Sequence, residues 1–404
     1  MISRYLASVG TELRRLGSRG RGRILFVVAL GWGLTVGGRM VYPVLLPHLR
    51  VSFDLDLAAA GLLLSFLFVA YALGQLPGGV LADRVGERLT LTLSVGLSGL
   101  ALVLLAGVGT TGALFGGTIL LGFAVGLYAI GRFTAVATLY PEGYGTAVGV
   151  LNVAPAIGQA LLPPLAGVVA VLVGWRAGFG FLVPAFVLVA LSLWLVVPVR
   201  DADAERAVDS LSLGTVRHLL SVLRDPAIVL ATTVMILGIS VWQAFTGFYP
   251  TYLIEEKGLS STAASLLFGI YFAATAFMHP ISGLIYDRLD VRYTLGVVGV
   301  AAVSLAALPF VDSIWILTIV SILLGTLLAF ETSTESYLVA TLPADVQGTG
   351  FGVLRTTVFA VGAISPVAFG AVAERGFFDE VFFVFAGLAA VVVVLGTRLP
   401  VVDR

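Results

Sequence analysis

VATLYPEGYGTAVGVLN, from Val136 to Asn152, decides the fold, because the chain nearly repeats it as VATLPADVQGTGFGVLR, from Val339 to Arg355. The two copies share VATL, a Gly-Thr pair and the run Gly-Val-Leu, all at one offset of 203 residues (Val136 to Val339) in a chain of 404. A repeat of about half the chain length in an apolar protein is typical of membrane proteins built from two related helical bundles.

The composition points to lipid as the solvent of this chain. It is 59% hydrophobic and 11% charged, with a mean hydropathy of +1.05, whereas soluble domains carry roughly 25% charged residues. The apolar runs are about 20 residues or longer and do not alternate, which is the signature of membrane helices rather than of barrel strands. The sequence therefore predicts an all-α integral membrane protein.

Several function classes are disfavoured by what the chain lacks. It has no cysteine, so disulfides and thiolate metal sites are excluded, and its net charge of zero argues against a nucleic-acid partner. No phosphate-binding loop and no nucleophile–base arrangement is visible. We therefore expect neither an enzyme nor an ATP-driven pump, and no cofactor or metal.

Twelve membrane spans are predicted, in two pseudo-symmetric six-helix bundles over residues 24–199 and 226–398. Residues 1–23 form a basic tail, 200–225 a polar linker and 399–404 the C-terminus. The spans run over residues 24–49, 57–82, 89–109, 112–138, 144–172, 176–198, 226–253, 260–286, 293–311, 313–341, 347–373 and 377–397.

Arginine positions predict the orientation. The basic tail, the linker and the loops on the same side hold far more arginines than the loops on the other side. Because positive charge favours the cytoplasmic side, we expect both termini in the cytoplasm of a multi-pass plasma-membrane protein.

The loop after the second span reads GVLADRVGER, from Gly79 to Arg88, and a degenerate copy, GLIYDRLDVR, runs from Gly283 to Arg292 after the eighth. The first copy resembles the signature loop of the major facilitator superfamily of secondary transporters, and the likeness extends over about residues 24–398. It implies two six-helix bundles, a central substrate site and alternating access. It also implies a conformational gate at the cytoplasmic side, formed by Gly79, Asp83, Arg84, Gly86, Arg88, Asp287 and Arg288.

Three positions depart from the family pattern. Glu87 stands where a basic residue is usual, and Asp290 replaces the second glycine of the degenerate copy. The family's intramembrane arginine near the start of the fourth helix, often tied to proton coupling, is absent, with Thr118 near its place. Proton coupling would then need other groups.

The fifth span also carries a motif. Gly149, Gly158, Pro163 and Gly167 resemble the helix-5 motif of proton-coupled antiporters, with Leu162 and Ala166 replacing two of its glycines. The resemblance implies drug or metabolite export. The alternative is close packing between the bundles, because small residues let helices approach.

Five ionisable residues lie inside predicted spans, where a charge is costly and usually faces a cavity or a partner. They are Arg39, Arg132, Glu331, Glu335 and Arg355. At the repeat offset Arg132 corresponds to Glu335, and Asn152 corresponds to Arg355. The family resemblance places four of the five on helices that line the central cavity, so we expect function where the halves differ in charge.

The charges suggest a division of roles. Glu331 and Glu335 are four residues apart and share a helix face, so repulsion and burial favour a proton on one of them. We expect Arg355 to pair with a glutamate, leaving Arg39 and Arg132 for an anionic substrate, because guanidinium suits carboxylate or phosphate. In the alternative, all five form structural ion pairs, with Arg132 on one glutamate and Arg355 on the other.

Aromatic residues on the seventh span recur at helical spacing and predict a wall around an organic solute, with Gln243 as a polar contact near the counterpart of Arg39. Ordinary packing is the alternative. The predicted wall comprises Tyr42, Trp242, Phe245, Tyr249 and Tyr271.

Together these features predict a monomeric secondary transporter that moves a small anionic or amphipathic solute by alternating access. We expect a proton as the coupling ion and lipid as the surrounding partner. The alternatives are a drug or metabolite:proton antiporter and, outside transport, a membrane sensor or lipid scramblase of the same fold.

Overall fold

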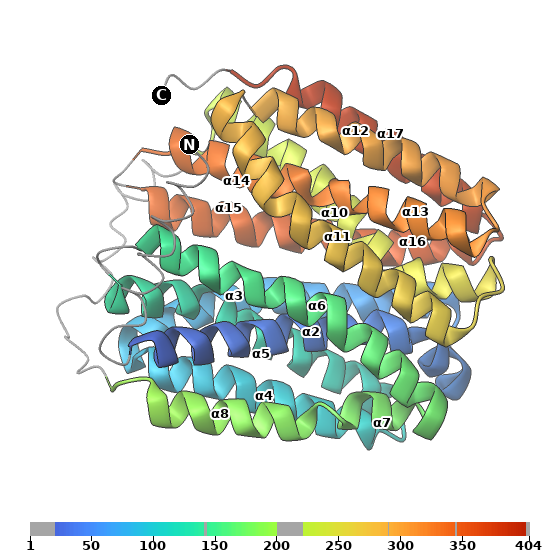
Figure 1. Ribbon diagram of the computed structural model, residues 1–404, viewed down its shortest axis with the longest axis horizontal. Helices are drawn as coiled ribbons and strands as arrows, with labels where there is room; N and C mark the ends of the chain where they lie inside the picture. Colours follow the sequence, from blue (N-terminus) through green and yellow to red (C-terminus); the bar gives the residue numbers. More distant parts are fainter. Residues whose placement is uncertain (1–20, 141–143, 200–220, 290, 344–345, 401–404) are drawn as a thin grey trace, which may run out of the picture.

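The computed structural model describes residues 21–140, 144–199, 221–289, 291–343 and 346–400, which form helices joined by short turns (Figure 1). Within these residues, twelve helical segments are long and apolar enough to cross a membrane. The predicted all-α membrane fold is therefore confirmed. The predicted tail 1–23 and linker 200–225 lie largely outside the described residues.

The first half of the chain supplies the blue-to-green helices of Figure 1. They are α2 (Arg21–Phe53), α3 (Leu57–Val85), α4 (Glu87–Ala106), α5 (Thr111–Leu139), α6 (Tyr144–Val173), α7 (Trp175–Gly180) and α8 (Val183–Val196).

The second half supplies the yellow-to-red helices, which lie beside the first group (Figure 1). They are α10 (Pro226–Glu255), α11 (Ser261–Arg288), α12 (Val291–Ala307), η3 (Leu308–Phe310), α13 (Ile314–Leu324), η4 (Gly325–Leu328), α14 (Ala329–Thr341), α15 (Gln347–Gly362), α16 (Ser365–Ala373) and α17 (Phe378–Gly396).

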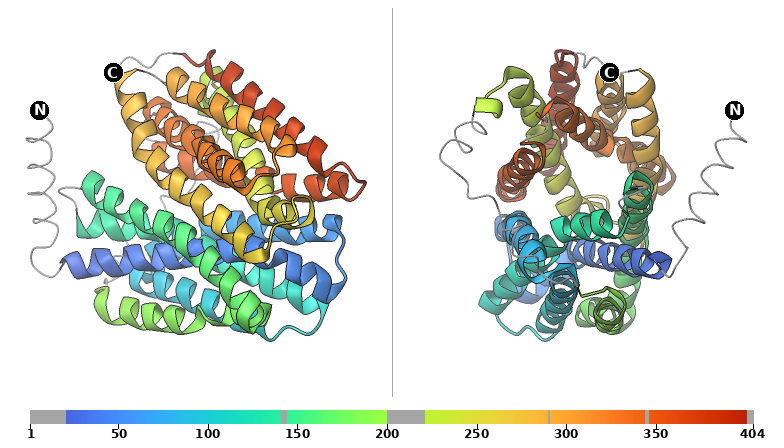
Figure 2. Two further views of the ribbon diagram at one scale, coloured as in Figure 1. Left: turned by 45° about the vertical axis from the view of Figure 1, so that its right-hand side comes forward. Right: turned by 90° about the vertical axis from the view of Figure 1, so that its left-hand side faces the viewer.

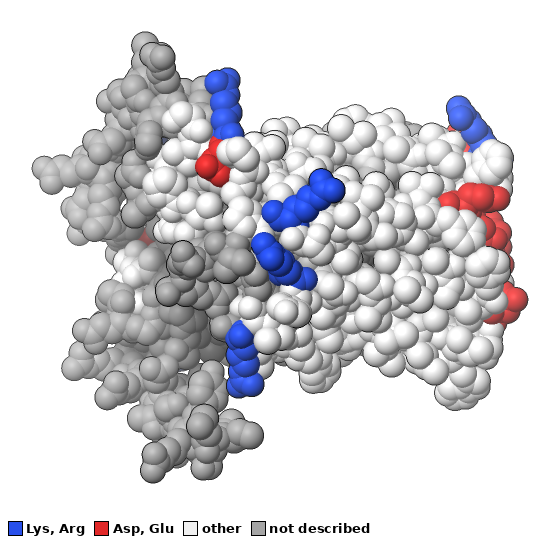
Figure 3. Space-filling view, turned by 90° about the horizontal axis from the view of Figure 1, so that it is seen from above, with Lys and Arg blue, Asp and Glu red and all other residues white. Residues whose placement is uncertain are grey.

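The helices run between two ends of the molecule. We call the end where α2 begins and α17 ends the tail end, and the end where α2 meets α3 the loop end. In the space-filling view, basic side chains gather toward the tail end and mostly acidic ones at the loop end, with uncharged surface between (Figure 3). A broad uncharged belt is what a lipid-facing surface requires.

Local sequence sets several helix starts. Asp56 Oδ1 accepts a hydrogen bond from Ala59 N at 2.6 Å at the start of α3, and Asp225 caps α10 in the same way. Such caps satisfy backbone donors that the first helical turn leaves open. Gly86 joins α3 to α4 with φ of +86°, a conformation that glycine adopts without steric cost.

Three spans predicted as single helices are interrupted. The sixth breaks at Phe181 and Leu182, between α7 and α8. The tenth passes through the 3-10 segment η4, where Gly325 packs against the backbone of Thr275 in α11. The eleventh breaks between α15 and α16, where Pro366 lacks the N–H that a continuous helix would need. Sequence periodicity misses these breaks because the apolar run continues through them.

The halves approach most closely at the loop end, through glycines. A Cβ on Gly61 of α3 would overlap the Pro366 carbonyl of α16, and one on Gly370 would overlap the backbone of Leu57. The same arrangement joins α6 and α11, where a Cβ on Gly269 would meet Pro164. Two helices of each half, α3 and α6 in the first and α11 and α16 in the second, therefore contact the other half through their backbones.

Polar contacts add to this closure. Leu57 N donates to Glu374 Oε2 at 2.6 Å, and Val367 N donates to Ser65 Oγ at 3.1 Å. Arg50 of α2 forms an ion pair with Glu255 of α10. The helices of the two halves diverge toward the tail end (Figure 2, left). The structure is thus a conformation closed at the loop end.

Candidate functional site

The five intramembrane charges lie near the middle of the molecule, divided between the halves. Arg39 and Arg132 belong to α2 and α5 of the first half, and Glu331, Glu335 and Arg355 to α14 and α15 of the second. The charges of Glu331 and Arg355 act on both arginines of the first half. The halves therefore face each other with unlike sets of charge.

Arg39 is held by aromatic rings. Its guanidinium carbon lies 4.2 Å from the Tyr71 ring centroid and 5.5 Å from that of Phe68, both on α3. The residue is 3% exposed, and its Nε and Nη1 have no hydrogen-bond partner among the described residues. Cation–π contact offsets part of the cost of burying this charge, but these two N–H groups remain unsatisfied.

Arg132 has a similar environment nearer the tail end. Its guanidinium carbon lies 3.8 Å from the ring centroid of Trp32 on α2 and 4.1 Å from that of Phe133. Nη1 donates to the Ala129 carbonyl of its own helix at 2.8 Å, whereas Nε has no partner in the described part of the chain. The residue is 4% exposed.

The two acids of the second half share one counter-ion. Arg355 Nη1 pairs with Glu335, and Arg355 Nη2 lies 3.8 Å from Glu331 Oε1. The two glutamates share a face because they are one turn apart on α14. One guanidinium therefore contacts two carboxylates.

This arrangement differs from the predicted all-paired alternative, in which Arg132 binds a glutamate. Among the described residues, no Asp or Glu forms an ion pair with Arg39 or Arg132. Two buried cations in the first half thus have aromatic neighbours but no counter-ion in the described part of the chain.

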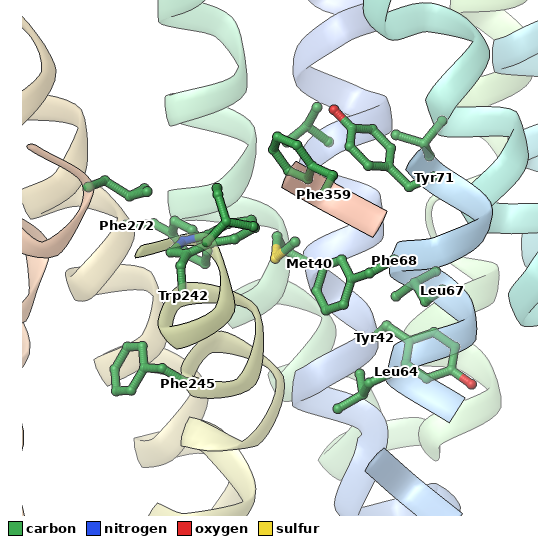
Figure 4. Close-up of a cluster of buried hydrophobic side chains, with 14 of the residues drawn as sticks. Met40, Tyr42, Leu64, Leu67, Phe68, Tyr71, Trp242, Phe245, Phe272 and Phe359 are labelled. Atoms are coloured by element: carbon green, nitrogen blue, oxygen red, sulfur yellow. The ribbon is translucent and has the colours of Figure 1, made fainter. Parts of the chain in front are cut away.

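Aromatic side chains fill the space between the halves beside Arg39 (Figure 4). Phe68 of α3 packs on Trp242 of α10 with ring centroids 6.1 Å apart, and Tyr71 packs on Phe359 of α15 at 5.4 Å. Met40 lies between Phe68 and Trp242 (Figure 4). Of the predicted aromatic wall, Trp242 is the member placed at this boundary.

Three other members of the predicted wall have partners within the second half. Phe245 stacks on Tyr249 at 4.7 Å and lies edge-on to Tyr271 at 5.2 Å. The Tyr249 hydroxyl is 2.6 Å from Ser321 Oγ of α13.

Tyr42 makes the matching bond in the first half, where its hydroxyl lies 2.6 Å from Thr118 Oγ1 of α5. Thr118 and Ser321 are 203 residues apart, which is the offset of the sequence repeat. Tyr42 and Tyr249 are themselves 207 residues apart, so only the hydroxyl partners match the repeat; each bond lies within one half, and both tyrosines serve the internal packing of their bundle. Thr118, which stands near the place of the family's intramembrane arginine, takes part in the Tyr42 bond.

Gln243 joins two helices of the second half. Its Nε2 donates to the Phe359 carbonyl of α15 at 3.3 Å, and its buried Oε1 has no partner among the described residues. The side chain therefore positions Phe359, which in turn contacts Tyr71.

The helix-5 motif residues lie on α6 and serve close packing. A Cβ on Gly158 would overlap the carbonyl of Gly33 in α2, and one on Gly167 would overlap Ser265 of α11 across the halves. Pro163 is buried, whereas Gly149 is exposed, and a Cβ on Gly149 would meet no described atom within 4 Å. The packing alternative accounts for Gly158 and Gly167.

The predicted gate residues lie at the tail end. Gly79 packs beside Ile130 of α5, Asp83 and Arg84 are exposed on the last turns of α3, and the Arg88 guanidinium lies 4.1 Å from the Trp194 ring centroid. Arg288 is exposed at the end of α11, and Asp287 belongs to the same helix. Their gating role stays a prediction.

Sequence reasoning missed the aromatic residues that hold the arginines: Trp32, Phe68, Tyr71 and Phe359. Tyr71 is the most informative of them, because its ring contacts Arg39 of the first half and Phe359 of the second. One available signal was a tyrosine, a polar aromatic residue, in the middle of a strongly apolar span. Which arginine it meets depends on helix packing that one sequence does not specify.

Comparison with known proteins agrees with this architecture. A sequence profile of the Major Facilitator Superfamily matches residues 24–366 and 241–404. The chain is 26% identical to a probable sulfoacetate transporter of Cupriavidus necator, over 92% of each chain. It is 24% identical to a probable galactarate/D-glucarate transporter of Bacillus subtilis, over 94% of this chain and 91% of the relative.

A probable nitrate/nitrite antiporter of Thermus thermophilus is 24% identical, over 69% of this chain and 65% of the relative, so the chain spans just under two thirds of that protein. Among solved structures, the nucleoside transporter NupG superposes with a TM-score of 0.77 and 17% identity, over 93% of this chain and 99% of the other.

A bacterial homologue of the human lysosomal transporter Spinster, solved in an inward-facing and occupied conformation, superposes with a TM-score of 0.75 and 16% identity, over 94% and 96% of the two chains. At these identities the structures show the fold, and the profile shows the family. The chain is a membrane transporter rather than an enzyme, and it belongs to the Major Facilitator Superfamily.

Proposed function

We propose that the protein carries a small organic anion across the plasma membrane together with protons. The observation that supports this is the unequal pairing of the central charges. Arg39 and Arg132 are buried without a counter-ion in the described residues, whereas Glu331 and Glu335 share Arg355. The first half would bind the anion and the second half would carry the proton.

The energetics favour an anion at the two arginines. An unpaired buried cation costs several kcal/mol, of which cation–π contact returns about 0.5–2 kcal/mol. A carboxylate, sulfonate or phosphate would satisfy the open N–H groups of Arg39 and Arg132 and restore charge balance. Substrate binding thus supplies the counter-charge that the first half does not provide for itself.

Coupling follows from the ion pairs on α14 and α15. A proton on Glu335 removes one of the two negative charges held by Arg355, and the freed guanidinium can turn toward an incoming anion. Conversely, a bound anion near Arg355 competes with the two glutamates for its guanidinium and weakens their ion pairs with it. The proton and the anion then bind to the same conformation and favour each other's binding, which is the requirement for symport.

The names of the relatives are consistent with an anionic substrate. Several are described as transporters of sulfoacetate, galactarate or D-glucarate, cis,cis-muconate or nitrate, each of which is an anion near neutral pH. Exchange instead of symport is a second candidate, because one relative is described as a nitrate/nitrite antiporter.

The closed loop end fits one stage of alternating access. We place the tail end in the cytoplasm, because the arginine-rich segments lie there. The structure then corresponds to a state closed toward the outer side. Release of the Arg50–Glu255 and Leu57–Glu374 contacts would open the outer side.

The proposal can be tested with the purified full-length protein. We expect small organic anions to raise the melting temperature in a thermal-shift screen, and Arg39→Ala to raise the apparent dissociation constant of each anion that binds. Arg398→Gln, an exposed tail-end arginine, is the matched control and should bind as the wild type does. Stabilisation by cationic amphiphiles and not by anions would contradict the proposal.

A further inference from the structure

Arg39 and the ring that contacts Arg132 lie along one face of α2. The Arg132 guanidinium stacks on Trp32, which belongs to the same helix as Arg39 and precedes it by seven residues. Seven residues are close to two helical turns, so the side chains of Trp32 and Arg39 share a face and leave the helix about 10 Å apart along its axis. Arg132 therefore binds nearer the tail end than Arg39, at a spacing that an extended substrate can bridge.

Tyr71 lies beside Arg39 and joins it to the second half. Its ring lies 4.2 Å from the Arg39 guanidinium carbon, and the charges of Glu331 and Arg355 act on both Arg39 and Arg132. Across the boundary Tyr71 meets Phe359, which follows Arg355 by one helical turn. The two arginines, the tyrosine and the Arg355–glutamate group therefore belong to one continuous site and not to two.

The charges of this site can be summed. With both glutamates ionised, the five intramembrane groups carry a net charge of +1, from Arg39, Arg132, Arg355, Glu331 and Glu335. A dianion bound with one proton on each glutamate leaves the net charge at +1. The empty and the loaded protein then carry the same charge inside the membrane. The conformational change therefore has no additional electrostatic cost in either state.

We propose that the substrate is an extended dianion with an acidic group at each end, one held by Arg39 and the other by Arg132, and that two protons accompany it on Glu331 and Glu335. This inference rests on the proposed function and adds the substrate class and the stoichiometry. Each glutamate gains one proton on the side of loading and loses it on the side of release, so the cycle moves no net charge.

The first test is binding of matched probes to the purified protein by calorimetry. Adipate carries two carboxylates on an extended chain, its monomethyl ester carries one, and succinate is a shorter diacid. A second charge-assisted contact predicts that adipate binds at least about tenfold more tightly than its monoester. Adipate should also bind more tightly than succinate, whose carboxylates are too close together for the two arginines.

A variant separates the second contact from the first. In Arg132→Gln, the affinity for adipate should fall to that for the monoester, which itself should bind as it does to the wild type through Arg39. Arg398→Gln should keep the wild-type preference. Equal affinities for diacid and monoester in the wild type would overturn the dianion inference while leaving anion transport intact. Absence of binding by every anion tested would overturn the proposed function as well.

The second test addresses stoichiometry in proteoliposomes. With a fixed pH gradient and a membrane potential set by potassium and valinomycin, the initial rate of adipate uptake should be the same at inside-negative, zero and inside-positive potential. A rate that rises or falls steadily with potential shows that charge moves with the substrate, and this contradicts the two-proton assignment. Potential-independent uptake that the pH gradient does not accelerate contradicts proton coupling itself.

Discussion

Removing the Glu374 carboxylate should shift the protein toward a conformation open at the loop end. This side chain, at the end of α16, accepts a hydrogen bond from Leu57 N at 2.6 Å, so it joins the second half to the first turn of α3. In this position it meets the positive end of the α3 dipole as well as an open backbone donor. The bond exists only while the loop end is closed.

The size of the effect follows from these two contributions. A carboxylate at a helix N-terminus contributes about 1 kcal/mol, and glutamine keeps an acceptor but loses the charge. Glu374→Gln should therefore lower the ratio of closed to open protein about fivefold. Glu374→Ala also loses the acceptor and should lower the ratio by a further factor of about three to ten.

Distance measurement between spin labels can report this ratio. The chain has no cysteine, so labels can be introduced without background substitutions. Val51→Cys and Ser313→Cys provide one exposed site in each half at the loop end. We expect a longer-distance population to grow in the order wild type, Glu374→Gln, Glu374→Ala.

Glu380→Gln is the matched control, because Glu380 is an exposed acid at the same end in the first turn of α17. Its distance distribution should equal that of the wild type. If Glu374→Ala also leaves the distribution unchanged, or if Glu380→Gln changes it equally, the reasoning about the Leu57 contact is refuted.

Three further predictions concern packing and charge. Gly158→Ala places a Cβ against the Gly33 backbone and should destabilise the protein by about 1–3 kcal/mol, seen as a lower melting temperature. Tyr249→Phe loses the bond to Ser321 and should cost about 1 kcal/mol of stability without changing anion affinity; a changed affinity would place Tyr249 in the site after all. Partial burial and the nearby Asp379 and Glu255 raise the pKa of Glu256, so its charged form is disfavoured in the folded protein. Stability from this group is therefore present at low pH and lost as pH rises through the raised pKa, and Glu256→Gln should raise the melting temperature at neutral pH but not at acidic pH.

The sequence predicts the architecture because lipid imposes simple rules. Twelve apolar runs, their arginine-rich flanks and the repeat at Val136 and Val339 suffice to predict twelve helices in two related halves. The interruptions between α7 and α8, at η4 and before Pro366 were not predicted, because the apolar run continues through each of them.

The candidate site was only partly predictable. Charge in an apolar run identifies Arg39, Arg132 and the two glutamates from sequence alone, since such residues are costly in lipid. Their partners are set by how the helices rotate about their axes. Tyr42 and Tyr249 therefore proved to bond within their own halves, whereas Tyr71 emerged as the neighbour of Arg39.

The division of roles between the halves can be measured most directly in proteoliposomes containing the Glu331→Gln/Glu335→Gln double variant, with Glu380→Gln as control. We expect the double variant to exchange labelled for unlabelled anion across the membrane but not to accumulate anion when a pH gradient is imposed. The control should do both. Accumulation driven by the pH gradient in the double variant would contradict the claim that these glutamates carry the protons.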